Sequence, residues 1–182
     1  MIEKNSIEAK LLAERNEMYS RRECARISGV EERREEDVEK IVIDIGRKVG
    51  VEIDRRDIAA AHRVGSKKEG KERQIIAKFV NRKDKEKLVQ AARKKAKEVD
   101  ELKGKVYVNE DLTDLRGKMC GLARKCDRVK SVVTVNGNIL CYMKEVRHDG
   151  KNVVKRIDGP EDLAEVLGES VKVVLKKIGL ME

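Results

Sequence analysis

The alternation of apolar and polar residues in residues 24–111 predicts short strands interleaved with two helices. Four runs show the two-residue alternation of apolar and polar side chains that is typical of a half-buried strand: Cys24–Val30, Asp57–Val64, Gln74–Val80 and Lys105–Val108. The Ala run inside Asp57–Val64 is also compatible with a helix. Glu35–Val49 and Asn81–Lys97 instead repeat apolar residues every three or four positions, and Asn81 is placed to cap the second helix. The resulting order, β-α-β-β-α-β, is that of a ferredoxin-like domain.

The segment before this region predicts a helix that ends a coiled coil. Glu3–Arg22 contains no Gly or Pro, and Ile7, Leu11 and Met18 follow the spacing of a coiled-coil seam. Charged residues hold the other seam positions, namely Lys4, Glu14 and Arg21. Because short isolated helices are marginal in water, we expect a mainly monomeric chain at micromolar concentration, with trimers only when more heptads precede this helix.

The C-terminal part predicts a smaller α/β domain with a three-stranded sheet. Thr113–Cys126 has helical spacing, and the strands Ser131–Thr134 and Ile139–Met143 flank Asn136-Gly137, a residue pair typical of a type I′ turn. A third strand and two further helices are expected at Asn152–Ile157, Glu161–Leu167 and Glu169–Ile178. The chain is therefore expected to be α+β, with a helix at 1–23, an RNA-recognition-motif-like domain at 24–111 and a third domain at 112–182.

The positive charge of the chain is concentrated in one quarter of its length. The 182 residues carry a net charge of +9, and His62–Lys105 alone holds 16 Lys and Arg against 7 Asp and Glu. A localised positive field is typical of a protein that binds a polyanion. Lys-rich helical faces also occur simply as solvated surface, and much of Asn81–Lys97 fits that alternative.

Composition argues against several other classes of protein. Aromatic residues make up only 2% of the chain and Trp is absent, so an aromatic-walled pocket for a small molecule is not expected. No apolar run approaches the roughly 20 residues that span a bilayer, and the first residues lack the apolar core of a signal peptide. We therefore expect an intracellular protein without a membrane partner.

Metal binding and catalysis are also not expected. Cys24, Cys120, Cys126 and Cys141 form no CxxC pair, and the only histidines are His62 and His148. No Gly-rich segment has the P-loop spacing. The acidic run Glu31–Asp37 could bind a metal, but it better fits the N-terminus of the helix Glu35–Val49, where acidic side chains are favourable. We expect no cofactor, no metal and no enzymatic activity.

Strand alternation selects the candidate binding residues of the first sheet. Ala25, Ile27 and Phe79 are expected to face the helices, which leaves Arg26, Lys78 and Tyr107 on the open face. The loop that follows the second strand adds four cations: Lys67, Lys68, Lys71 and Arg73. With a single ring on that face, contact with phosphate is favoured over reading of bases. Because exposed substitutions are usually tolerated, replacing Arg26 and Lys78 is expected to leave stability nearly unchanged.

Four segments resemble the first open-reading-frame protein of LINE-type (long interspersed element) non-LTR retrotransposons. They are YSRRECARISGV, QIIAKFVNRKDKEKLVQAARKK, LKGKVYVNEDLTDLRGKM and SVVTVNGNILCYMKEVRHDGKNVVKRIDGPEDLAEVL, which together cover roughly residues 16–167. The resemblance implies a coiled coil, a non-standard RNA-recognition motif and a C-terminal nucleic-acid-binding domain. It also implies cooperative binding of single strands by a trimer with chaperone activity.

The resemblance carries further basic residues into the candidate set. Those that match the family's nucleic-acid contacts are Arg26, Arg63, Arg73, Lys78, Arg93 and Arg116. We add Arg124, on the helix Thr113–Cys126. The chain departs from the family in its short coiled coil and in Val132 or Val133, which replaces an aromatic residue frequent in the C-terminal strands.

Together these observations predict a non-enzymatic protein that binds single-stranded RNA, and also DNA, mainly through phosphates. By resemblance it belongs to a retrotransposon ribonucleoprotein in the cytoplasm, with the nucleus as a further location, and self-associates through its N-terminal helix. The alternative is an oligomeric protein-interaction scaffold that does not bind nucleic acid.

Overall fold

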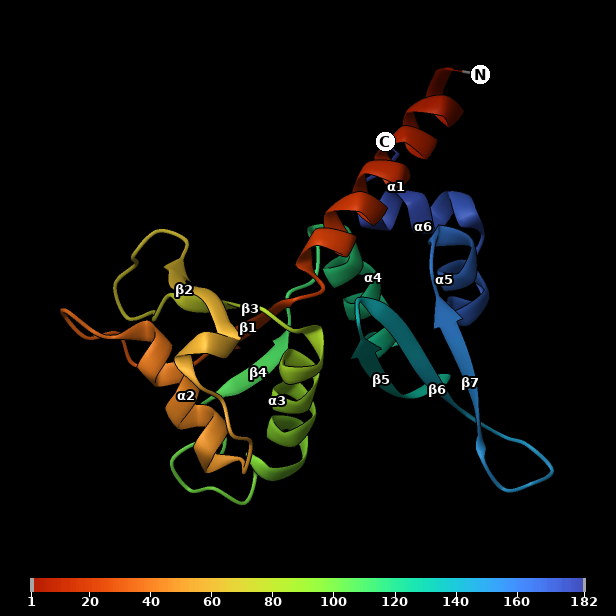
Figure 1. The fold of residues 1–182 in the computed structure, drawn as a ribbon. Coiled ribbons are helices and arrows are strands. Elements are labelled where there is room, and N and C mark those ends of the chain that lie inside the picture. The colour runs from red at the N-terminus through yellow and green to blue at the C-terminus, as the bar shows by residue number, and fades with distance from the viewer. Residues whose placement is uncertain (1, 182) are drawn as a thin grey trace. The chain divides into compact units, whose positions relative to one another are not determined.

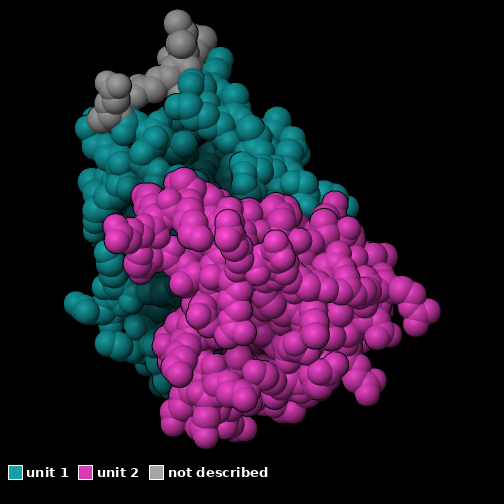
Figure 2. Space-filling model, turned by 90° about the vertical axis from the view of Figure 1, so that its left-hand side faces the viewer, with its two compact units in different colours: residues 1–21, 112–182 teal, residues 22–111 magenta. Residues whose placement is uncertain are grey.

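The structure is a computed structural model that describes residues 2–181, and it is a mixed α+β chain with two separate sheets (Figure 1). Residues 22–111 form one compact unit, and residues 1–21 together with 112–182 form the other (Figure 2). The N-terminal helix α1 (Ile2–Arg21) therefore packs with the C-terminal part of the chain. No helix within residues 2–181 is long and apolar enough to cross a membrane.

The unit of residues 22–111 has the predicted element order β-α-β-β-α-β. In sequence it contains β1 (Cys24–Ser28), α2 (Val38–Lys48), a 3₁₀ turn η1 (Arg55–Asp57), β2 (Ile58–Val64), β3 (Gln74–Phe79), α3 (Arg82–Lys95) and β4 (Tyr107–Glu110). The four strands pair antiparallel in the order β2-β3-β1-β4, so β1 and β3 are central neighbours as expected. The ambiguous Ala run in β2 is a strand.

One face of this sheet is buried beneath α2 and α3. Ala25, Ile27 and Phe79 are fully buried, and they share a core with Val42 of α2 and Leu88 of α3. This confirms the assignment of alternating strand residues to the helix side. Because side chains alternate along each strand, the residues between them lie on the opposite, open face.

The element boundaries in this unit differ from the expected ones by up to three residues, and two of the differences have a clear cause. The first helix begins at Val38, because Asp37 is its N-cap and accepts a hydrogen bond from the Lys40 backbone N–H at 3.0 Å. Most of the acidic run Glu31–Asp37 thus precedes the helix instead of forming its first turn. The last strand begins at Tyr107, two residues later than predicted, because residues 100–105 form a series of turns.

The other unit contains a three-stranded antiparallel sheet and four helices. After α1 come α4 (Asp114–Lys125), β5 (Val129–Val135), β6 (Asn138–Val146), β7 (Asn152–Ile157), α5 (Pro160–Leu167) and α6 (Val171–Ile178), and the strand order is β5-β6-β7. Asn136 and Gly137 both have positive φ, at 52° and 79°, as the predicted type I′ turn requires. Met119, Ile139 and Leu163 belong to a core that is separate from that of residues 22–111.

Helix α1 joins this unit through a buried ion pair. Arg116 Nε donates to Glu14 Oε1 at 2.8 Å, and the Thr113 hydroxyl donates to the same oxygen at 2.7 Å. One turn further along α1, Met18 is 2% exposed and lies so close to Gly137 that a Cβ there would be 2.8 Å from the Met18 side chain. Glu14, a charge at a predicted coiled-coil seam position, is thus buried against its own C-terminal unit.

Candidate nucleic-acid interface

The open face of the four-stranded sheet brings Arg26, Lys78 and Tyr107 onto neighbouring strands. Arg26 lies opposite Ile76 of β3 and Asn109 of β4, whereas Lys78 lies opposite Cys24 and Tyr107 opposite Ser28. Lys78 and Tyr107 are therefore diagonal neighbours of Arg26, displaced toward opposite ends of β1. Diagonal positions in an antiparallel pair are roughly 7–8 Å apart, within reach of long side chains.

Arg26 is held in place by two neighbours. Its Nε and Nη2 donate to Asp111 Oδ1 at 2.8 and 2.6 Å, and its Nη1 donates to Gln74 Oε1 at 2.8 Å. The Asp111 side chain is 4% exposed, whereas that of Arg26 is 31% exposed. The guanidinium is thus partly open to solvent and fixed in orientation, but a carboxylate offsets part of its charge.

Lys78 and Tyr107 are more accessible than Arg26. The Lys78 side chain is half exposed, and its ammonium lies 4.0 Å from Glu23 Oε2, a distance that leaves the charge largely available to solvent. Tyr107 is one of the most exposed large hydrophobic side chains of the described residues, with 56% of its surface open. Among these three residues the face therefore presents one exposed cation, one cation held by hydrogen bonds and one aromatic ring.

Sequence reasoning missed two other polar residues of this face. His62 on β2 lies opposite Ile76, which places it in the same row across the sheet as Arg26 and Asn109, and both His62 and Asn109 are exposed. Extending the alternation argument to β2 would have found His62. That step required knowing that the ambiguous Ala run is a strand.

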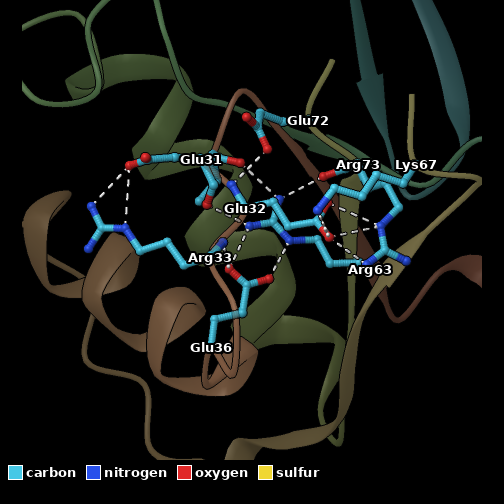
Figure 3. A network of polar contacts seen from close by, with 9 residues as sticks. Glu31, Glu32, Arg33, Glu36, Arg63, Lys67, Glu72 and Arg73 are labelled. Carbon is cyan, nitrogen blue, oxygen red and sulfur yellow. Dashed lines mark hydrogen bonds and ion pairs between the residues drawn. The ribbon is translucent and has the colours of Figure 1, made fainter. Parts of the chain in front are cut away.

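Arg63, by contrast, is buried on the helix side of β2. Its side chain is 4% exposed and pairs with Glu36, with Nε donating to Oε1 at 2.7 Å and Nη2 donating to Oε2 at 3.0 Å. Its remaining donors reach the carbonyl oxygens of Val30, Glu31 and Arg73 (Figure 3). With all these donors engaged, Arg63 links the segment before α2 to the end of the basic loop, and no donor faces the open sheet.

The same acidic segment neutralises the base of the loop. Arg73 donates to both carboxylate oxygens of Glu32, at 2.6–3.2 Å, and Lys67 Nζ lies 3.9 Å from Glu32 (Figure 3). The hydrogen bonds from Arg73 lower the pKa of Glu32 to about 2, so this carboxylate is charged at neutral pH. Arg63 likewise lowers the pKa of Glu36.

The tip of the loop keeps its positive charge. Lys67 is 76% exposed, and within residues 2–181 the side chains of Lys68 and Lys71 form no ion pair. The hydrogen bond between their backbones closes a turn in which Gly70 has a φ of 68°. Three lysines therefore lie on an exposed turn, while Arg73 anchors the end of the loop to Glu32.

The regional charge of His62–Lys105 is smaller in the folded protein than in the sequence. Four carboxylates from outside this region pair with its cations, namely Glu23, Glu32, Glu36 and Glu110. The Lys85–Glu110 pair, at 2.8 Å, lies in the core between α3 and β4. The positions of these four carboxylates in the sequence do not identify them as partners of the basic residues.

The remaining candidate residues lie outside the sheet face. Arg93 is in the last turn of α3. Arg116 is buried in the ion pair with Glu14, and its Nη1 donates to the Gly137 carbonyl oxygen at 2.8 Å, so its donors are directed into its own unit. Arg124 is exposed in the last turn of α4.

The described residues contain no cluster of metal ligands. Within residues 2–181, no group of three His, Cys, Asp or Glu side chains could hold a metal ion. Within residues 2–181 no disulfide joins the four cysteines, and burial raises the pKa of Cys141 to about 11, which keeps this thiol protonated and unreactive at neutral pH.

No known protein-family model matches the chain, and no curated protein matches it.

Proposed function

We propose that the chain binds single-stranded nucleic acid, principally RNA, through the open face of the sheet of residues 22–111 and the lysines of the adjoining loop. The observation that carries the proposal is the placement of Arg26, Lys78 and Tyr107 on neighbouring strands, opposite the helix-covered face. Lys67, Lys68 and Lys71 extend the positive surface beyond the adjoining ends of β2 and β3, in the path of a phosphate backbone that leaves the face there.

The chemistry of this face favours contact with phosphates over the reading of base sequence. Phosphate contacts position a nucleic acid but carry no sequence information, and they make binding strongly dependent on salt. One exposed ring allows stacking, which any base can provide. Affinities for unrelated single strands of equal length should therefore agree within about tenfold.

The resemblance to the LINE-type family supports a proposal for the domains and the biological role of the chain. In this proposal residues 22–111 are a non-standard RNA-recognition motif, and residues 112–182 are the C-terminal nucleic-acid-binding domain. The protein is then a non-enzymatic component of a LINE-type retrotransposon ribonucleoprotein with chaperone activity. Trimerisation through an extended coiled coil and a cytoplasmic location, with the nucleus as a second site, belong to the same proposal.

A binding series with single- and double-stranded RNA and DNA, each titrated with salt, tests the proposal. We expect the single strands to bind more tightly than the duplexes, and log K to fall linearly with log salt, by about 0.7 for each phosphate contact. A protein-interaction scaffold would show no binding, and a general duplex-binding protein would prefer the double strands. Either of these results would overturn the proposal.

A further inference from the structure

A groove of about 210 Å³ runs along the free edge of the four-stranded sheet, between β4 and the C-terminal end of α3. Its apolar lining comes from Ala92 and Ala96 at the end of α3, from Val108 of β4, and from Leu102 and Val106 in the segment that precedes β4. Gly104, which has a φ of 68°, lies at the rim, and no heavy atom lies within 4 Å of the position that a Cβ would occupy there. The entrance beside Gly104 is therefore open.

The rim of the groove is polar on both sides. Tyr107 and Asn109 line it on the side of the open sheet face, and Arg93 and Lys97 line it on the side of α3. Asn109 is the residue opposite Arg26 in the sheet register, so the groove continues directly from the face described above. A chain that crosses the face over Arg26 meets the groove at the next strand, about 4.8 Å away.

The strand that lines the groove also offers backbone hydrogen-bonding groups. β4 is the last strand of the sheet, and its outer edge pairs with no other strand of the described sheet. The Asp111 N–H donates to the Cys24 carbonyl oxygen, so backbone groups of alternate residues point toward β1. Those of Val108, one of the intervening residues, consequently point outward to the free edge.

We propose that this groove binds one unpaired nucleobase of the single strand, an inference that rests on the function proposed above. The apolar lining suits the faces of a base, and Tyr107, which also lines the groove, supplies a ring that can stack on it. The Asn109 amide and the Val108 backbone offer a donor and an acceptor each to the polar edge of the base. Arg93 and Lys97 lie on the other side of the groove, where the phosphates flanking the inserted base would run.

The charged rim decides between a base and an apolar protein side chain as the occupant. Two cations beside a small apolar groove suit an aromatic base that is attached to a negatively charged backbone. A base in a duplex is stacked and paired, so only an unpaired base can enter. The groove thereby favours single strands over duplexes without selecting a sequence.

The test compares two single-stranded oligomers of equal length and charge, one with bases and one made of abasic nucleotides. Wild-type protein should bind the base-bearing strand about tenfold more tightly, which is the size of a single stacking contact. Ala96→Leu places a larger apolar side chain in the groove without changing charge. It should lower this preference by about fivefold or more and leave the affinity for the abasic strand unchanged.

Two further variants keep the test decisive. Tyr107→Ala removes the exposed ring, should not affect folding because that side chain is 56% exposed, and should weaken the preference in the same way. Ala9→Leu, on an exposed position of α1, is the matched control and should retain the full preference. Circular dichroism verifies that each variant is folded.

The possible outcomes separate this inference from the proposed function. If both oligomers bind and folded Ala96→Leu keeps the wild-type preference, the groove does not hold a base, whatever the result for Tyr107→Ala, because Tyr107 also lies on the open sheet face. The proposed function then stands. If neither oligomer binds at low salt, the proposed function is overturned and the groove with it.

Discussion

Replacing Arg26 and Lys78 by Ala, singly and together, separates their role in binding from their role in the fold. Both face the open side of the sheet, but they differ in their surroundings. Lys78 is half exposed with a carboxylate only at 4.0 Å, and such surface pairs contribute about 0–1 kcal/mol. We expect Lys78→Ala to change the free energy of unfolding by no more than about 0.5 kcal/mol.

Arg26→Ala should cost more, because Asp111 depends on it. The Asp111 carboxylate is 4% exposed and accepts two hydrogen bonds from Arg26. Breaking a fully buried pair costs about 3–5 kcal/mol, but the Arg26 side chain is 31% exposed, so water can replace part of the interaction. We expect a decrease of about 1–3 kcal/mol in the free energy of unfolding. This differs from the expectation based on exposure alone, that both substitutions leave stability nearly unchanged.

The effect on binding follows from counterion release. On a single strand, each phosphate that the protein no longer neutralises lowers the slope of log K against log salt by about 0.7, so the slope of the double variant should be smaller by about 1.4. Fluorescence anisotropy with one labelled oligomer over a salt series measures the slope, and urea unfolding measures stability. Arg47→Ala, which removes a cation from an exposed position of α2, is the control and should leave the slope unchanged.

Two results would refute this reasoning. If the double variant is folded and binds with the wild-type slope, the open face of the sheet is not the binding surface. If Arg47→Ala lowers the slope as much as Arg26→Ala does, binding responds to the total charge of the protein and not to the geometry of the sheet.

Four further predictions concern the fold and its ionisable groups. Phe79→Ala removes a fully buried ring and should destabilise residues 22–111 by about 3–5 kcal/mol, measured by urea unfolding; a change below about 1 kcal/mol would contradict the core assignment. Arg63→Ala should lower stability by about 3 kcal/mol, because it leaves Glu36 without its buried partner, while the salt slope of the folded variant stays at the wild-type value. Because the pKa of Glu32 is lowered from 4.5 to about 2 and that of Glu36 is also lowered from 4.5, both carboxylates contribute stability above about pH 4.5. The contribution of Glu32 is lost as the pH falls toward about 2 and that of Glu36 as the pH falls through its lowered pKa, so Glu32→Gln/Glu36→Gln should flatten this dependence in unfolding experiments. Light scattering should find a mainly monomeric species at micromolar concentration, since Glu14 and Met18 of the predicted seam are buried within the chain's own unit, and a stable trimer of this chain would contradict that.

The elements of this protein could be predicted from the sequence because they depend on local periodicity. Gln74–Phe79 alternates so clearly that its inward and outward residues were assigned correctly, and the Asn136-Gly137 pair identified the hairpin. The candidates Arg26, Lys78 and Tyr107 followed from the same alternation. Element ends were less predictable, since Asp37 could equally begin a helical turn or cap it.

Only the tertiary structure decided which basic side chains remain available. The partner of Arg26 is 85 residues away in the sequence, that of Arg63 is 27 residues away, and that of Arg116 is 102 residues away. Ion-paired residues, unlike the apolar residues of a strand or helix, do not recur at a regular spacing in the sequence. Whether a basic side chain is available to a ligand depends on whether folding brings a carboxylate within hydrogen-bonding distance of it. Composition and alternation thus determined the elements and the positive character of the chain, whereas long-range packing determined that Lys78 is accessible while Arg63 and Arg116 are buried in ion pairs.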